Sequence, residues 1–255
     1  MIYDLSSMAF LVFLSFLPAV VDSCLGMGYG FTITPLLLVL GFSPIQAIPA
    51  VLLSSLVGSL LSAYFHHRFE NVDLSADSIH LRISLIMGGL GSIGSLFGAL
   101  VALGISTFYL NLYIGLMVTT LGFFVLVSRR LKLRFSWPRM VAFGIVGAFN
   151  KGISGSGFGP IVTTGGLLVG LDEKATVSIQ SFSELFASIV GFLTFVLSRA
   201  PVDVYLTLAM SIGVALSSPI AAFIVHKMPA EKLRWLIALT AILLGVITLI
   251  RLLLV

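Results

Sequence analysis

Long apolar runs, separated by short polar segments, dominate the hydrophobic pattern of the chain. A transmembrane helix needs about 20 apolar residues to cross a hydrocarbon core about 30 Å thick. Two apolar stretches, 7–41 and 139–170, are interrupted by glycine-rich segments. Six uninterrupted runs reach the required length, at 46–65, 82–103, 106–128, 175–198, 204–225 and 233–254. The pattern therefore predicts an all-α, multi-pass integral membrane protein.

The two glycine-rich breaks match each other. Their glycines recur at one constant spacing, which we call the repeat spacing: Gly26, Gly28 and Gly30 return as Gly155, Gly157 and Gly159. An aromatic residue fills the same place in each break, Tyr29 in the first and Phe158 in the second. A shared register, followed each time by three long apolar runs, indicates an internal repeat. We therefore predict two repeats, residues 1–130 and 131–255, within one integral membrane domain.

Short arms beside the breaks favour a re-entrant architecture. The run 161–170 would be about 15 Å long as a helix, which is half of the hydrocarbon thickness. We expect each repeat to be a re-entrant or broken helical hairpin plus three transmembrane helices. Three crossings in each repeat would make the repeats inverted relative to each other. In the alternative, each broken segment spans the membrane once and the repeats are parallel.

Lysine and arginine residues indicate the orientation, because they concentrate in cytoplasmic loops. The inverted arrangement leaves only Arg199 and Arg251 in the outer loops. The parallel arrangement moves these two residues inside, and it places four basic residues outside: Lys174, Lys227, Lys232 and Arg234. The distribution favours inverted repeats, with both termini outside the plasma membrane.

The composition excludes a soluble globular protein. Hydrophobic residues make up 58% of the 255 residues, and charged residues make up 9%. A soluble domain usually carries about 25% charged residues. The net charge of +4 comes from basic residues in short loops, so it reflects membrane orientation and not nucleic-acid binding. The single cysteine, Cys24, leaves no intrachain disulfide and is expected to pack as a small apolar residue.

The glycine tips are the candidate binding site for a small anion. Glycine lets a ligand approach the backbone closely, and each tip leads into a short helix beginning near Phe31 or Pro160. Two helix N-termini meeting at the membrane midplane would offer free N–H donors and positive partial charge to an anion. In the alternative interpretation, the glycines only permit close helix packing. The expected binding residues are Gly26, Gly28, Tyr29, Gly30, Asn150, Lys151, Ser154, Gly155, Ser156, Gly157, Phe158 and Gly159.

Lys151 would add a full positive charge to this site. A lysine at membrane depth is costly and is usually functional. The alternative is that its side chain extends to the interface and keeps its ammonium in water. Asp22 occupies the corresponding position in the first repeat, and it could pair with Lys151.

Glu184 is the candidate group for proton coupling. It lies midway along the run 175–198, and helical spacing places it on one face with Gln180 and Ser183. Removal from water would favour the protonated carboxyl, which could then carry a proton during transport. The alternative is a structural hydrogen bond to another helix.

Enzymatic and metal-dependent functions have weak support. Gly152-Ile153-Ser154-Gly155 matches the Gly-x-Ser-Gly of rhomboid-like intramembrane serine proteases, for which His226 would be the partner. The adjacent His66 and His67 diverge by about 100° on a helix, so they cannot easily bind one metal ion. There is no phosphate-binding Walker loop and no His-Glu-x-x-His motif. We expect no enzyme activity, no metal and no cofactor.

Motifs through nearly the whole chain carry a family resemblance. They are the tip Gly26–Gly30 with Pro35, Gly41-Phe42-Ser43-Pro44 with Ala47, Asn71-Val72-Asp73, the tip Gly155–Gly159, Gly170-Leu171 with Ala175, and Pro201-Val202-Asp203. This arrangement resembles the sulfite exporter TauE/SafE family. The resemblance implies a secondary transporter that moves sulfite, organosulfonates or other small sulfur-containing anions, usually outward across a prokaryotic plasma (inner) membrane. An anion channel is the alternative function, and homo-oligomerisation stays open.

Overall fold

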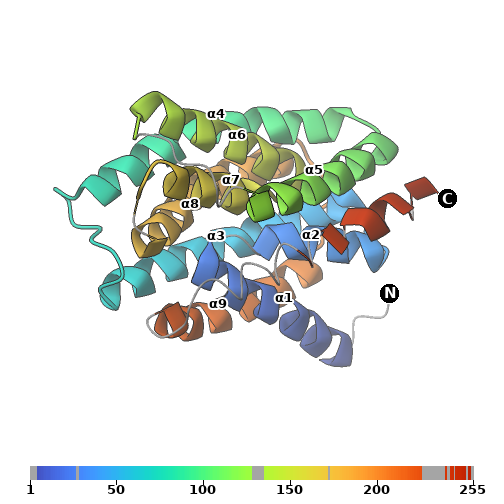
Figure 1. Ribbon diagram of the computed structural model, residues 1–255. Helices are drawn as coiled ribbons and strands as arrows, with labels where there is room; N and C mark the ends of the chain where they lie inside the picture. Colours follow the sequence, from blue (N-terminus) through green and yellow to red (C-terminus); the bar gives the residue numbers. More distant parts are fainter. Residues whose placement is uncertain are drawn as a thin grey trace.

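The computed structural model describes residues 5–26, 29–127, 135–171, 173–225 and parts of 239–253. These residues form helices and no strands (Figure 1). The helices are α1 (Leu5–Leu25), α2 (Tyr29–Val39), α3 (Pro44–Arg68), α4 (Ile79–Gly104), α5 (Thr107–Val127), α6 (Trp137–Ser154), α7 (Phe158–Leu168), α8 (Glu173–Leu197) and α9 (Val204–Val225).

The prediction of an all-α integral membrane protein is confirmed. Within the described residues, the helices long and apolar enough to cross a membrane are Leu5–Cys24, Pro44–Arg68, Ile79–Gly104, Thr107–Phe124, Lys174–Leu197 and Val204–Ile224. Five of the six predicted runs coincide with α3, α4, α5, α8 and α9. Of the sixth, 233–254, the structure describes parts of 239–253, and these described residues are helical. The structure instead adds α1, which we expected to be one arm of a broken segment.

Both glycine-rich segments interrupt a helix. α1 ends before Gly26 and α6 ends before Gly155, and these two glycines adopt φ of +62° and +69°. Residues with a side chain rarely adopt this left-handed backbone conformation, and a glycine therefore ends each helix there. The helices that follow, α2 and α7, have 11 residues each. At about 16 Å, each is half the length that a membrane crossing needs.

Helix boundaries recur at the repeat spacing. The bounds of α7 follow those of α2 at this spacing, and the bounds of α8 follow those of α3 in the same way. Glu70 and Arg199, which follow α3 and α8, both adopt φ of +57°. The proposed boundary at residue 130 lies outside the described residues. That boundary and the inversion of the second repeat stay predictions.

Helices from the two parts of the chain are interleaved. α1 packs along α9, and α6 packs along α4, at opposite edges of the bundle (Figure 1). α3 and α8 contact each other between these pairs, and they also contact α9 and α4 respectively. Neither α1–α5 nor α6–α9 therefore forms a body with a separate core.

The contact between α4 and α6 is close enough to bring backbone against backbone. A methyl group at Gly94 would overlap the carbonyl oxygen of Ile145, and one at Gly98 would overlap that of Phe149. From the other side, a methyl group at Gly152 would overlap the oxygen of Ser95. Small residues drive helix association in membranes by permitting such packing. The same contact holds the end of α6, where the second break begins.

We expect Gly98→Ala to lower the melting temperature of the purified protein. Overpacking of a close contact costs about 1–3 kcal/mol. Gly89 lies on the same helix with no atom within 4 Å of its added methyl group, so Gly89→Ala is the matched control and should be neutral or slightly stabilising. Thermal unfolding in detergent measures both variants. Equal melting temperatures would show that the α4–α6 contact tolerates a wider spacing.

Candidate functional site

The two glycine tips touch each other inside the bundle. A methyl group at Gly30 would overlap the carbonyl oxygen of Gly155. Thr163, on α7, donates a hydrogen bond from its hydroxyl to the carbonyl of Gly26 at 2.7 Å. The breaks therefore form one junction, and each tip is braced by the other part of the chain.

A cavity of about 10 Å³ lies at this junction, which is room for a single water molecule. α2 begins at Tyr29 and α7 begins at Phe158, so two helix N-termini open onto the cavity. N-terminal N–H groups without helical partners give this region positive partial charge. The lining residues are Asp22, Tyr29, Gly30, Phe31, Lys151, Ser156, Gly157, Phe158, Gly159, Pro160 and Glu184.

Lys151 lies wholly inside the bundle, with 1% of its surface exposed. Its ammonium donates to Glu184 Oε1 at 2.6 Å and to Ser55 Oγ at 2.7 Å. The side chain therefore does not extend to the membrane interface. The structure pairs the ammonium with Glu184, while Asp22, the partner expected from the repeat, lines the same cavity.

Glu184 is bound by donors from three helices. Besides Lys151, its second oxygen accepts from Gln180 Nε2 at 2.7 Å and more weakly from Ser59 Oγ at 3.4 Å. Gln180 lies one turn earlier on α8, where the helical spacing placed it. Ser183 instead donates to the backbone of Ser84 on α4 at 3.1 Å and to Ile179. Of the three residues predicted to share one face of α8, Glu184 lines the cavity and Gln180 bonds to Glu184, whereas Ser183 contacts α4.

Several predicted binding residues have structural contacts. The amide of Asn150 accepts from Tyr113 at 2.6 Å and donates to the carbonyl of Val146 at 2.8 Å. The hydroxyl of Ser154 donates to the carbonyl of Asn150 at 2.6 Å and accepts from the N–H of Ser156 at 3.1 Å. These bonds shape the end of α6, and they engage the serine that a protease mechanism would require. Gly28 and His226 lie outside the described residues.

The hydroxyl of Ser156 is the unsatisfied polar group of the cavity. It is 1% exposed and has no hydrogen-bond partner within the described structure. The phenol of Tyr29, by contrast, bonds Ser54 on α3 at 2.7 Å, so its ring lines the cavity while its hydroxyl is engaged. A buried hydroxyl without a partner is costly unless a ligand or water completes its bonding. Ser156 is therefore available to a molecule in the cavity.

Sequence reasoning missed the serines of α3. Ser55 contacts Lys151, and Ser59 contacts Glu184. The signal was present in the sequence, because Ser55 precedes Glu184 by the repeat spacing. Aligning Ser55 with Glu184 in the comparison of the two repeats would have drawn attention to this face of α3.

Charge at the junction favours neither anions nor cations outright. Lys151 supplies one positive charge, and Glu184 and Asp22 supply two negative charges when all three groups are ionised. An anion beside Lys151 must therefore compete with Glu184 unless a carboxylate is neutralised. Broken helices around a buried charged site are the architecture of secondary transporters.

Comparison with known proteins identifies the class and then the family. The chain is 29% identical over 252 residues to the probable membrane transporter protein YtnM of Bacillus subtilis (strain 168), a match covering 94% of this chain and 81% of the relative. The model of the sulfite exporter TauE/SafE family matches residues 11–248. The chain therefore belongs to the TauE/SafE family of membrane transporters, as its motifs indicated. No solved structure matches it.

We expect the Lys151–Glu184 pair to show strong coupling in a double-mutant cycle. Lys151→Met or Glu184→Gln alone leaves a buried charge without its partner, which costs about 3–5 kcal/mol. The double variant removes both charges and should recover much of the loss. Thermal unfolding of the four proteins in detergent measures the coupling. Additive losses would mean that the two charges are stabilised independently.

Proposed function

We propose that the chain is a secondary transporter that exports small sulfur-containing anions such as sulfite or organosulfonates. The anion binds at the junction of the two glycine tips, beside Lys151. The observation that carries this proposal is the buried ammonium of Lys151, which lies where two helix N-termini meet. Membership of the sulfite exporter family supports the substrate class.

The donor set suits a compact oxyanion. Sulfite and sulfonate groups present three oxygens, which can accept from the ammonium of Lys151, the hydroxyl of Ser156 and N-terminal N–H groups of α2 or α7. A cavity of about 10 Å³ holds one water, so the tips must separate to admit the anion. The contact between Gly30 and Gly155 is the place where they would part. Opening toward one side and then the other gives alternating access.

Glu184 would couple a proton to this movement. The ionised carboxylate holds Lys151 at 2.6 Å, so it competes with the anion for the ammonium. A proton on Glu184 removes that competition, and the proton and the anion would therefore bind together. A divalent anion carried with one proton moves one net negative charge. An inside-negative membrane potential contributes about 2.3 kcal/mol per charge per 100 mV to outward movement of that charge.

We expect Lys151→Ala to reduce sulfite flux strongly in proteoliposomes at sulfite concentrations that half-saturate the wild type. Loss of a hydrogen bond to a charged group, worth about 1.5–3 kcal/mol, corresponds to roughly 10- to 100-fold weaker anion binding. Lys151→Arg, which keeps the charge, is the matched control and should retain part of the flux. Wild-type flux in a folded Lys151→Ala protein would remove the lysine from the proposal. Absence of flux for any sulfur anion in the wild type would contradict the substrate class.

We expect flux through Glu184→Gln to be insensitive to an imposed pH gradient. The glutamine keeps the shape of the side chain but cannot exchange a proton. Wild-type flux should respond to the gradient at constant membrane potential. The comparison uses sulfite uptake into proteoliposomes, with the potential clamped by an ionophore. A wild-type flux that ignores the gradient and does not saturate would instead indicate an anion channel.

A further inference from the structure

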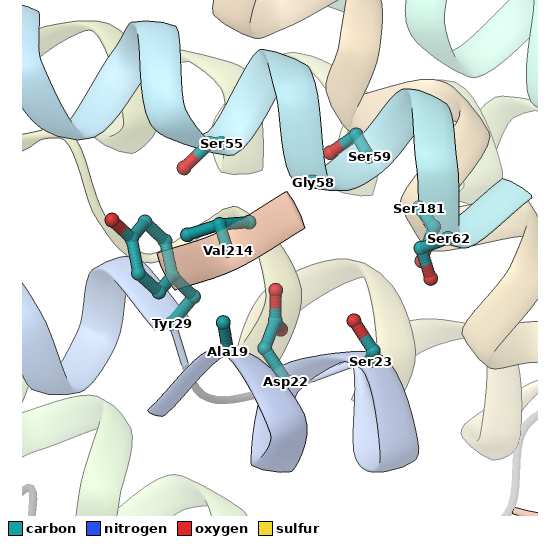
Figure 2. A pocket seen from close by; sticks show the side chains of 10 residues that line it. All are labelled: Ala19, Asp22, Ser23, Tyr29, Ser55, Gly58, Ser59, Ser62, Ser181 and Val214. Atoms are coloured by element: carbon teal, nitrogen blue, oxygen red, sulfur yellow. The ribbon is translucent and has the colours of Figure 1, made fainter. Parts of the chain in front are cut away.

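A second cavity lies beside the junction, among α1, α2, α3, α8 and α9 (Figure 2). It also measures about 10 Å³, which suits one water or one small ion. Its lining is rich in hydroxyl oxygens and contains one carboxylate. The residues are Ala19, Asp22, Ser23, Tyr29, Ser55, Gly58, Ser59, Ser62, Ser181 and Val214.

The hydrogen bonds of Ser59 and Ser62, two serines of this cavity, are long, whereas Ser55 and Tyr29 each take part in a bond of 2.7 Å. Figure 2 shows the carboxylate of Asp22 and the hydroxyl of Ser23 directed from α1 toward α3. Ser62 and Ser181 are 3.4 Å apart, as are Ser59 and Glu184 Oε2. Hydroxyl hydrogen bonds are normally about 2.7–2.8 Å. Oxygens at the longer distance keep lone pairs that a cation could use.

The repeat spacing relates this cavity to Lys151. Asp22 precedes Lys151 by that spacing, and the two residues occupy the last turns of α1 and α6. Helix C-termini carry negative partial charge, and the C-terminal ends of broken helices coordinate Na⁺ or protons in other transporters. At the C-terminal end of α6, the ammonium of Lys151 supplies a positive charge that faces the negative partial charge of the helix end. At the end of α1, the corresponding residue is a carboxylate facing a cavity.

We propose that this second cavity is a Na⁺ site. The ion would be coordinated by the carboxylate of Asp22 and by hydroxyl oxygens of the surrounding serines. Oxygen donors suit hard cations. A single carboxylate neutralises a monovalent ion but not a divalent one. The size of the cavity selects a small ion that has lost its hydration shell.

Na⁺ in this site would assist anion binding. Asp22 and Tyr29 line both cavities, and Ser55 lines the second cavity while contacting the ammonium of Lys151. Neutralising Asp22 removes a negative charge that repels an anion beside Lys151. This coupling step rests on the proposed function, whereas the binding of Na⁺ does not.

Thermal unfolding of the purified full chain in detergent tests the site. The probe is NaCl, titrated against choline chloride at constant ionic strength, with KCl as a second comparison. We expect Na⁺ to raise the melting temperature with saturating binding behaviour, and K⁺ to have a much smaller effect. Asp22→Asn should lose the response. Ser62→Ala should require a several-fold higher Na⁺ concentration for half of the effect.

Ser188→Ala is the matched control. Ser188 follows Ser59 by the repeat spacing, is buried, and lies outside both cavities. The melting temperature of the Ser188→Ala protein should respond to Na⁺ as that of the wild type does. Equal melting temperatures in Na⁺ and choline would overturn the proposal. So would an equal effect of K⁺, or an unchanged response in Asp22→Asn and Ser62→Ala. A Na⁺ response in a protein that moves no sulfur anion would support the site while contradicting the proposed substrate.

Discussion

An ammonium placed among membrane-spanning helices must be neutralised where it lies, and Glu184 neutralises Lys151 at 2.6 Å. This ion pair determines the arrangement around it. It fixes the last turn of α6 against the middle of α8, and Ser55 adds α3 to the same contact. The cost of separating the charges in a medium of low dielectric constant keeps these three helices together. For the same reason, the two charges can separate when an anion replaces Glu184 beside Lys151, or when a proton replaces Lys151 in neutralising Glu184.

Glycine supplies the geometry that the ion pair needs. The positive φ of Gly155 ends α6 directly after the turn that carries Lys151, and α7 can then begin at the cavity. Gly30 permits the first tip to approach Gly155 at backbone distance. A side chain at position 30 would hold the tips apart. Any residue other than glycine at position 155 would have a strained backbone conformation. The positive charge, the helix ends and the unpartnered hydroxyl of Ser156 meet for these reasons.

The sequence predicts the elements of this fold better than their contacts. Hydrophobic run length predicts five of the spans, because membrane thickness acts on each helix separately. The glycine motif predicts where α1 and α6 stop, since that is a local backbone property. The pairing of Lys151 with Glu184 depends on the rotation of α8 against α6, which no local pattern encodes. The bond from Tyr113 to Asn150 was missed for the same reason, because it depends on how α5 is rotated against α6. α1 was assigned to a re-entrant hairpin and not to a span, because it leads directly into the glycine break.

The pairing of α1 with α9 has a consequence for biosynthesis. Ser7 bonds Tyr205 across 198 residues, and Cys24 bonds the carbonyl of Ala221 across 197. α1 is translated well before α9, yet α9 is its main neighbour. At about 5–20 residues per second, α1 waits on the order of 10–40 seconds for that neighbour. During this interval lipid, or a membrane chaperone, must cover the face that α9 later occupies. Assembly of α1 with α9 is thus a post-insertional event that depends on contacts between segments far apart in the sequence.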